Sequence, residues 1–385
     1  MLQQIRKQAK HLTKTIIMVN RTIVWVTPEF FVETDIYIVP ALAEYYNIKW
    51  TIIHTCHEQV IPFYKVLLRE GNNPNIDVRF RKLPSGSPLS KRYFKFYWNI
   101  ITEIKSDEPD LIYSAILDFP FIPLAIIRVL KKKIIFAAHN VNTPKGVKHY
   151  KLTKAYMGLC LSWFKNFQTF SKSQYDLLNK KYKRKNAFFA PFVLKDYGTP
   201  TIIANEIITF LFFGRIRQYK CPDALINAAQ KLKKRTNIPF KVIIAGECSN
   251  WYEYQQLIKY PELFDLIIHS IDNENIPNLF ARCHYTILPY QDIAQSGALF
   301  VGINYSKPAI LSDLPAFKEV LTDNVNSLFI KPANVDDLVE KMKYILENHR
   351  TLYPVLISNL IDMKEKTFKK DLIVDKYRQY IDSLF

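Results

Sequence analysis

The first half of the chain alternates short apolar runs with longer stretches in which hydrophobic residues recur every three or four positions. The apolar runs are four to six residues long, which is typical of strands covered on both faces. They lie at 22–26, 50–55, 77–81, 110–115, 133–138 and 167–170, with helical patterns at 36–46, 91–104, 121–130, 152–165 and 172–181. Strands that alternate with helices predict a parallel sheet with helices on both faces.

A second series of the same kind follows a linker at 190–204, which contains Pro191, Gly198 and Pro200. Its strands are expected at 207–213, 240–245, 263–269, 285–288, 309–311 and 327–330, and its helices at 222–234, 251–259, 276–282, 297–305, 316–321 and 335–348. A helical stretch at 356–384 comes last. The pattern predicts two doubly wound α/β domains, at 1–195 and 205–350, and a helical segment at 351–385. Ligands of open α/β sheets bind at the carboxyl ends of the strands, so we expect the site in a cleft between the domains.

The composition excludes several classes of protein. Of the 385 residues 49% are hydrophobic, so the chain is globular rather than disordered. Five scattered cysteines, an odd number, indicate a reducing compartment instead of a disulfide framework. No apolar run approaches the roughly 18 residues of a membrane-spanning helix. The amino-terminal run at 15–19 is shorter than the core of a signal peptide. We therefore expect a cytoplasmic protein.

Nearly all of the net charge of +18 lies in the first half of the chain. Residues 1–200 contain 31 Lys and Arg against 14 Asp and Glu, whereas residues 201–385 contain 22 against 21. Such asymmetry indicates an anionic partner of the first half, which leaves nucleic acid, an anionic membrane surface and an acidic acceptor as candidates. Residues 2–16 form a basic amphipathic pattern suited to a membrane surface, although 1–17 also has the features of a frayed leader.

The segment 91–98 interleaves cations with aromatic residues, as proteins that bind single-stranded nucleic acid do. However, Phe94, Tyr97, Trp98 and Ile101 follow the spacing of one helical face. This spacing predicts that most of the segment is a buried helix face, and we expect no nucleic-acid partner.

Several motifs of common enzymes are absent from the sequence. It has no phosphate-binding P-loop, no Gly-x-Gly-x-x-Gly after the first strand, no HExxH, no CxxC pair and no Gly-x-Ser-x-Gly elbow. These absences disfavour an NTPase, a Rossmann dehydrogenase, a zinc enzyme and an α/β-hydrolase. No Asp-x-Asp is present to hold a metal on a nucleotide diphosphate. We therefore expect no metal and no cofactor, and an anion site that relies on Lys, Arg and helix termini.

Two loops of the second half have the chemistry of an anion site. In the first, Gly214 follows a strand, and Arg215 and Lys220 precede a helix that begins with Pro222. Its basic residues can lie beside a diphosphate, but they also suit a solvated loop. In the second, a strand runs out at Pro289, and Gln295-Ser296-Gly297 opens the next helix with free N–H groups and a hydroxyl. That arrangement also fits ordinary helix capping.

In the first half, two side chains follow strands where a ligand would bind. His139 comes directly after the strand at 133–138, and an imidazole there can hydrogen-bond a sugar hydroxyl or move a proton. A histidine in a loop is also often structural. Asp35 follows the first strand and is a candidate for the acceptor side or for capping the next helix, of which capping is favoured.

These motifs resemble those of glycosyltransferase family 4, a GT-B family of the glycosyl transferases group 1. The resemblance extends from 207 to 347 and rests on Gly214-Arg215-x4-Lys220, Leu288-Pro289-Tyr290 with Gln295-Ser296-Gly297, and the segments at 307–313, 317–320 and 326–332. The first half resembles the family in architecture and in His139-Asn140 after a strand. The implied fold is GT-B, in which two Rossmann-like domains face a central cleft.

The resemblance also implies roles for these residues. Arg215 and Lys220 would contact the donor diphosphate, Ser296 and Gly297 would supply N–H groups to it, and His139 would lie near the acceptor and the transferred sugar. Gly214, Tyr290 and Gln295 complete the donor side, and Asp35 and Asn140 the acceptor side.

The chain lacks two carboxylates that many members of the family have. Many members carry a pair of Glu whose positions are occupied here by Ile293 and Val301, and Cys221, Ser306 and Ser327 replace glycines. Asp292 or Gln295 is then the candidate to serve the sugar. His139 and Asp292 are therefore the candidate catalytic residues.

We therefore expect a hexosyltransferase that takes a sugar from a nucleotide diphosphate donor and passes it to a saccharide or lipid-linked saccharide in cell-surface glycan synthesis. It would work without metal, with retention of configuration, and at the inner face of an anionic membrane. The alternatives are a noncatalytic GT-B subunit that binds a partner enzyme and a basic nucleic-acid-binding protein.

Overall fold

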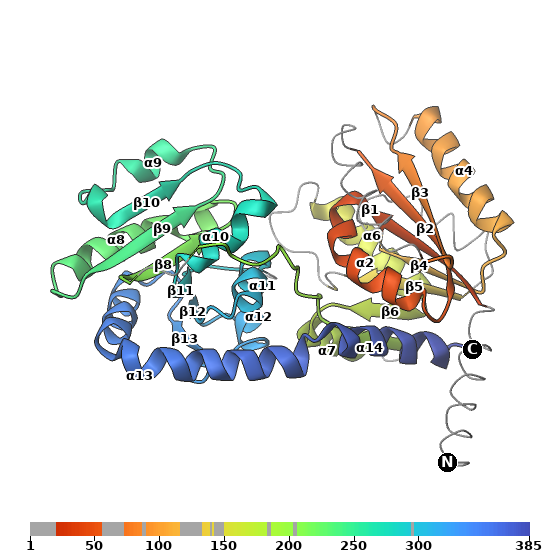
Figure 1. Cartoon of the computed structure of the whole chain (residues 1–385). Coiled ribbons are helices and arrows are strands. Elements are labelled where there is room, and N and C mark those ends of the chain that lie inside the picture. Colours follow the sequence, from red (N-terminus) through yellow and green to blue (C-terminus); the bar gives the residue numbers. More distant parts are fainter. Residues whose placement is uncertain are drawn as a thin grey trace, which may run out of the picture. The chain divides into compact units, whose positions relative to one another are not determined.

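The computed structural model describes residues 21–55, 73–86, 90–115, 133–138, 141, 150–182, 186–202, 206–293 and 296–385. The chain divides into two compact units, one composed of residues 1–193 and 370–385 and the other of residues 194–369 (Figure 1). Each unit is built around one parallel sheet. Among the described residues, no helix combines the length and the apolar character needed to cross a bilayer.

The sheet of the first unit has seven strands in the order β3-β2-β1-β4-β5-β6-β7. They are β1 (Thr22–Pro28), β2 (Asn47–His54), β3 (Ile76–Lys82), β4 (Leu111–Ser114), β5 (Lys133–Ala138), β6 (Asn166–Thr169) and β7 (Asn186–Phe189). All neighbours are parallel, and Trp25 of β1 lies in register with Trp50 and Tyr113 on its two sides. The sequence pattern did not predict β7, in which only the three residues after Asn186 are apolar.

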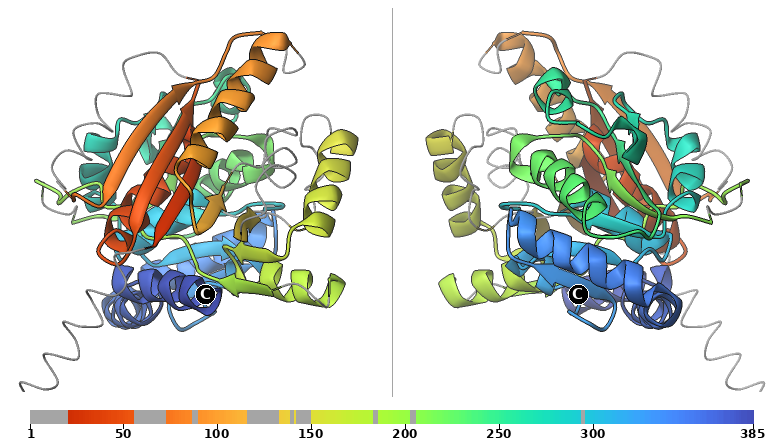
Figure 2. Two further views of the ribbon diagram at one scale, coloured as in Figure 1. Left: turned by 90° about the vertical axis from the view of Figure 1, so that its right-hand side faces the viewer. Right: turned by 90° about the vertical axis from the view of Figure 1, so that its left-hand side faces the viewer.

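Among the described residues, the helices that cover the two faces of this sheet are α2 (Glu29–Leu42), α4 (Lys91–Ser106), α6 (Tyr150–Trp163), α7 (Lys172–Lys181) and α14 (Lys370–Ser383). Successive residues of a strand point to opposite faces. Ile23 and Trp25 share a core with α2 and α14, whereas Val24 and Val26 share one with α4, α6 and α7. Figure 2 shows α4 lying along the strands β3 and β2.

The sheet of the second unit has six parallel strands in the order β10-β9-β8-β11-β12-β13. They are β8 (Ile208–Phe213), β9 (Phe240–Ala245), β10 (Phe264–Ile267), β11 (Tyr285–Leu288), β12 (Ala309–Ser312) and β13 (Ser327–Ile330). The chain builds outward from β8 to β10 and then returns to place β11 on the other side of β8. The strand order therefore reverses between β8 and β11, which is where doubly wound folds bind ligands.

The helices of the second unit are α8 (Pro222–Lys233), α9 (Trp251–Gln255), α10 (Ile276–Ala281), α11 (Gly297–Asn304), α12 (Pro315–Lys318) and α13 (Val335–Thr367). Phe210 and Phe212 share one core with α8 and α13. Leu211 and Ile243 point to the other face, where they share a smaller core with α10. The alternation of side chains along β8 thus fills both layers.

The C-terminal helices differ from the predicted ones. Helix α13 is continuous through Pro354, although a proline inside a helix costs about 3 kcal/mol. Leu356 and Leu360, beyond the proline, are buried in the same core as Leu338, and this burial offsets the cost. The chain leaves the helix only at Phe368. The predicted separate segment 351–385 is therefore divided between the units, with α14 packed into the core of the first.

The orientation of α4 corrects a second expectation. Phe94 and Trp98, expected on the buried face, are 70% and 55% exposed. The buried stripe consists of Tyr93, Tyr97, Ile100, Ile101 and Ile104. Because aromatic residues occupy positions 93, 94, 96, 97 and 98, hydrophobic spacing alone did not determine which side faces the sheet.

Candidate active site

The two loops identified in the sequence lie side by side at the carboxyl edge of the second sheet. One follows β8 and the other follows β11, and these strands are neighbours in the sheet. The backbone N–H of Gln291 donates to the carbonyl of Tyr219 at 2.8 Å, which joins the loops directly. The fold thus brings residues about seventy positions apart in the sequence to the point where the strand order reverses.

Two glycines form the base of this site. The N–H of Gly214 donates to Ala245 at 2.9 Å, and Gly214 has a φ of +97°. Gly246, at the end of β9, has a φ of +147°, and a methyl group built on it would lie 2.3 Å from the Gly214 carbonyl oxygen. Only glycine fits at this contact. Sequence reasoning missed Gly246, although a glycine directly after a strand in a chain with nine glycines was an available signal.

Lys220 points its ammonium group into the same corner. It ends a short 3-10 turn (Gln218–Lys220), and Cys221 follows with a φ of +51° before α8 begins. The Nζ atom lies 5.4 Å from the centre of the Tyr290 ring and 3.7 Å from a methyl group built on Gly214. Lys220 is only 9% exposed. Burial, together with the charges of Arg217 and Arg215, lowers its pKa to about 8.

Arg215 is placed differently, since its side chain is exposed to solvent. Its Nε lies 3.3 Å from a carboxylate oxygen of Glu247, whose side chain is also exposed. An exposed ion pair of this kind contributes little to stability, so the guanidinium can exchange this partner for another anion. Sequence reasoning did not identify Glu247, which comes from the loop after β9.

Tyr290 and Ser296 connect the second loop to this corner. Tyr290 is fully buried, and its ring meets Tyr219 edge-on at 6.2 Å and packs against Phe317 at 5.7 Å. Burial raises the pKa of the Tyr290 hydroxyl, while the neighbouring Ser296 lowers it. Tyr290 therefore acts as a rigid wall beside the Lys220 ammonium group.

The N-terminus of α11 opens onto the same side. The Ser296 hydroxyl caps the helix by accepting from the N–H of Leu299 at 3.3 Å. A methyl group built on Gly214 would lie 3.7 Å from Cβ of Ala298, so the first turn of α11 borders the Gly214 loop. Gly297 is exposed, and nothing lies within 4 Å of the position of a Cβ atom. The first N–H groups of α11 are therefore accessible to an anion.

The positions of the family's two carboxylates are apolar here. Val301 lies on α11 and is buried in the small core with Phe280 and Leu211. Ile293 is partly buried against the main core of this unit. Asp292, the candidate substitute, is exposed in the loop after β11. No group of three or more His, Cys, Asp or Glu gathers in the described part of the chain.

Asp35 occupies neither of its two expected roles. It lies inside α2, whose N-cap is Pro28, so it does not cap the helix. Its carboxylate is fully buried and accepts hydrogen bonds from Trp25 Nε1 at 2.9 Å and Thr27 Oγ1 at 2.6 Å. Burial raises the pKa of Asp35 to about 7. Because it is enclosed in the core of the first unit, it does not reach an acceptor, and its role is structural.

Five predictions concern residues that lie outside the described ones. They are the catalytic candidate His139, its neighbour Asn140, the donor-side candidate Gln295, the amphipathic segment 1–17 and the helix expected at 121–130. The structure thus brings together Gly214, Arg215, Lys220, Tyr290, Ser296 and Gly297.

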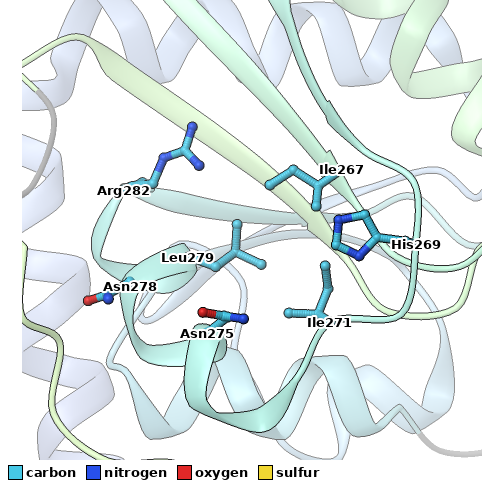
Figure 3. A pocket seen from close by; sticks show the side chains of 7 residues that line it. All are labelled: Ile267, His269, Ile271, Asn275, Asn278, Leu279 and Arg282. Atoms are coloured by element: carbon cyan, nitrogen blue, oxygen red, sulfur yellow. The ribbon is translucent and has the colours of Figure 1, made fainter.

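A pocket of about 240 Å³ lies elsewhere in the same unit (Figure 3). Ile267 ends β10 and His269 follows it, and both face α10 across the pocket. Asn275, Asn278, Leu279 and Arg282 line the side of α10, and Ile271 completes the lining. In the sheet β10 is separated from β8 by β9, and none of the predicted donor residues lines this pocket.

The doubly wound fold of the second unit and the basic loops at the reversal of strand order are what the resemblance to GT-B glycosyltransferases predicts. Residues 200–359 match the family model of glycosyl transferases group 1. This segment contains all of the residues that were predicted for the donor side. The expected resemblance to the glycosyl transferases group 1 is therefore confirmed over these residues.

Solved structures agree with this fold over nearly the whole chain. A glycosyltransferase from Rickettsia africae ESF-5 is 18% identical, with a TM-score of 0.74 over 94% of this chain and 98% of that one. Anabaena HepE, in complex with UDP and glucose, is 13% identical, with a TM-score of 0.70 over 94% of this chain and 100% of that one. Sucrose-phosphate synthase from Thermosynechococcus elongatus is 12% identical, with a TM-score of 0.70 over 95% and 99%. The predicted α/β GT-B fold is confirmed. No curated protein matches the sequence significantly.

Proposed function

We propose that this protein transfers a hexose from a nucleoside diphosphate donor to a saccharide or lipid-linked saccharide acceptor in cell-surface glycan synthesis. The transfer proceeds without a metal ion and with retention of configuration, and the protein works peripherally at the anionic inner face of a membrane. The excess of positive charge in residues 1–200 supports an anionic surface or acceptor on that side of the protein. HepE, whose structure holds UDP and glucose, is consistent with a UDP-sugar as donor.

The observation that carries this proposal is the buried charge of Lys220. Burying an ammonium group without a partner is costly, and the lowered pKa of Lys220 is the measure of that cost. No carboxylate of the described residues pairs with Lys220 in the ion pairs of this unit. A diphosphate bound over Gly214 would supply the missing negative charge. The site therefore favours a doubly charged anion over a neutral ligand.

The same groups support a leaving-group role. As the bond between sugar and diphosphate breaks, negative charge grows on the diphosphate oxygens. Lys220, Arg215 and the N–H groups of Gly297 and Ala298 then stabilise the developing charge electrostatically. These groups are fixed before the reaction, since Lys220 is held against Tyr290 and the α11 N-terminus is capped by Ser296. In this proposal they do the work that a divalent cation does in metal-dependent transferases.

Calorimetric titration of UDP and GDP into the full chain tests the donor site. Arg215→Ala removes a charge-assisted contact and should weaken binding by about 1.5–3 kcal/mol. Lys233→Ala, an exposed cation at the far end of α8, is the matched control and should bind like the parent. Unchanged affinity of Arg215→Ala for both nucleotides would reject the assigned diphosphate site.

Sugar transfer or donor hydrolysis tests the enzymatic part separately. UDP-hexoses and GDP-hexoses are incubated with the protein, and release of the nucleoside diphosphate is measured. Release that depends on Arg215 supports the proposal. Tight binding of a nucleotide sugar without release or transfer would instead favour the noncatalytic GT-B subunit, which the apolar positions Ile293 and Val301 also fit.

A further inference from the structure

The outer face of α4 presents two large aromatic side chains to solvent. Phe94 and Trp98 are 70% and 55% exposed, and Phe94 is the most exposed of the large hydrophobic side chains described. They lie one helical turn apart, and their rings stack with centroids 6.2 Å apart at an angle of 22°. The inner side of the helix is already packed on the sheet through Tyr93, Tyr97 and Ile101. The aromatic pair is therefore not part of the core.

Lys91 and Lys95 lie on the same helical stripe as this pair, and Arg92 borders that stripe. Lys91, Arg92 and Lys95 are exposed, and 91, 94, 95 and 98 follow the spacing of one helical stripe. Lys105 is exposed further along the helix. We name the set of Lys91, Arg92, Phe94, Lys95 and Trp98 the α4 aromatic face.

The two carboxylates in the last turn and at the C-cap of α4 are paired with arginines of β3. Glu103, the single acidic residue of the helix, accepts from Arg81 Nε at 3.0 Å. Asp107, at the C-cap, accepts from Arg79 Nη2 at 2.8 Å, and Arg79 also lies 3.3 Å from Glu103. Both arginines belong to β3, so they hold the acidic groups against the sheet. The outward charge of α4 is consequently positive.

We propose that the α4 aromatic face is the surface by which this protein docks on an anionic phospholipid bilayer. This inference rests on the proposed function only in that the function requires a membrane face, and it assigns that face to a particular helix. Tryptophan and phenylalanine lie at the level of the headgroups, while Lys and Arg reach the lipid phosphates. A convex helix with a self-stacked aromatic pair fits a planar interface better than a nucleic-acid strand, whose binders use grooves.

Co-sedimentation of the full chain with mixed phosphatidylcholine and phosphatidylglycerol vesicles tests the docking surface. The double variant Phe94→Ser/Trp98→Ser should bind about tenfold more weakly, because two aromatic side chains no longer leave water. Tyr252→Ser is the matched control, since Tyr252 is 64% exposed on α9 of the other unit. It should bind vesicles like the parent. Because Phe94 and Trp98 are exposed, the double variant should unfold at the parent temperature.

A charge variant tests the second component of the same face. Lys91→Gln/Arg92→Gln/Lys95→Gln should weaken binding to these vesicles by about a hundredfold, at roughly fivefold for each cation. The loss should be small for pure phosphatidylcholine vesicles. Lys233→Gln/Lys234→Gln removes two exposed cations of the other unit and should leave vesicle binding unchanged.

Fluorescence identifies which tryptophan meets the lipid. Vesicles that contain brominated phosphatidylcholine quench tryptophans at the bilayer surface, so quenching should disappear in Trp98→Phe and persist in Trp163→Phe. Trp163 is a stringent control because it is 45% exposed in the same unit. Loss of quenching in Trp163→Phe instead would overturn the assignment of the surface to α4.

Three other results would also overturn the proposal. The first is that deletion of residues 1–17 abolishes vesicle binding while both α4 variants bind normally. The second is that the parent binds no vesicles. The third is that the α4 variants lose affinity for an oligonucleotide and not for vesicles. UDP and GDP titration of the same variants keeps this test separate from the proposed function. The α4 variants should bind nucleotide like the parent, whereas failure of nucleotide binding in the parent would reject the donor site and leave the docking surface untouched.

Discussion

Replacement of Lys220 by methionine should change stability and ligand binding in opposite directions. Methionine keeps the length of the side chain and removes its charge. In the free protein the pKa of Lys220 is lowered from 10.5 to about 8, chiefly by burial. Each pKa unit corresponds to about 1.4 kcal/mol, so the folded protein spends about 3 kcal/mol to keep this ammonium group charged. A site that costs stability in the absence of its ligand is typical of functional positions.

The sign of the pH dependence follows from the two pKa values. The unfolded chain holds the Lys220 proton up to pH 10.5, whereas the folded chain releases it at about pH 8. Between these values the unfolded state binds more protons, so the contribution of this group to stability rises with pH. Lys220→Met should therefore be more stable than the parent by up to about 3 kcal/mol at pH 7. The advantage should shrink as the pH is raised above 8.

Binding of a diphosphate should reverse this balance. The ligand gives the ammonium group a partner, which raises the pKa of Lys220 towards its ordinary value and makes binding take up protons near pH 8. The coupling is limited to about 3 kcal/mol, which is about two orders of magnitude in affinity at pH 7. Lys220→Met should lose up to this amount.

Two measurements check this reasoning. Urea unfolding of the parent, Lys220→Met and the control Lys233→Met at pH 7 and pH 9.5 gives the stabilities. Titration of UDP in two buffers with different ionisation enthalpies gives the affinity and the number of protons taken up. The reasoning is refuted if Lys220→Met is less stable than the parent at pH 7, or if it binds UDP as tightly with the same proton uptake.

Three further predictions follow from other parts of the structure. Sugar transfer should survive EDTA, since Lys220 and Arg215 supply the positive charge; loss on chelation with recovery in manganese would contradict this. Burial lowers the pKa of His284 to about 4, and its Nδ1 accepts a hydrogen bond from the Thr209 N–H at 3.1 Å. Below pH 6.5 the unfolded chain therefore binds a proton at this histidine that the folded chain does not. Lowering the pH from 6.5 to 4 should destabilise the fold by up to about 3 kcal/mol. Urea unfolding of His284→Asn, which keeps an acceptor, should show a smaller loss. Ser306 has a φ of +52°, so Ser306→Gly should stabilise the fold by about 0.5–1 kcal/mol in urea unfolding, and Ser306→Ala should not.

The sequence by itself determined the layered architecture and the position of the donor loops. Strands and helices follow from local hydrophobic spacing, and five of the predicted elements agree with the structure to the residue, including β9, β11 and α7. Gly214 and Ser296 were identifiable because the first directly follows a strand and the second precedes a helix, and Lys220 because it lies in the loop that Gly214 begins. Parallel strands end at one edge of their sheet, so local motifs are sufficient to locate such a site.

Only the tertiary structure decided what depends on contacts between distant segments. The side of α4 that faces the sheet was not readable from a helix with aromatic residues on several sides, and the sheet selected Tyr93 and Tyr97 over Phe94 and Trp98. The sequence placed Asp35 between the first strand and the expected helix at 36–46, yet its carboxylate accepts hydrogen bonds from Trp25 and Thr27 in the core.

The tertiary structure also decided the need for glycine at 246, the position of α14 and the lowered pKa of Lys220. Gly246 is required by the carbonyl of Gly214 on the neighbouring strand, and α14 is held in the first unit by Tyr377 and Tyr380, whose partners lie about two hundred residues earlier. Hydrophobic periodicity reports which face of an element is apolar, whereas burial, pKa and close backbone contacts depend on which neighbour covers that face. Those neighbours are set by the packing of the whole domain.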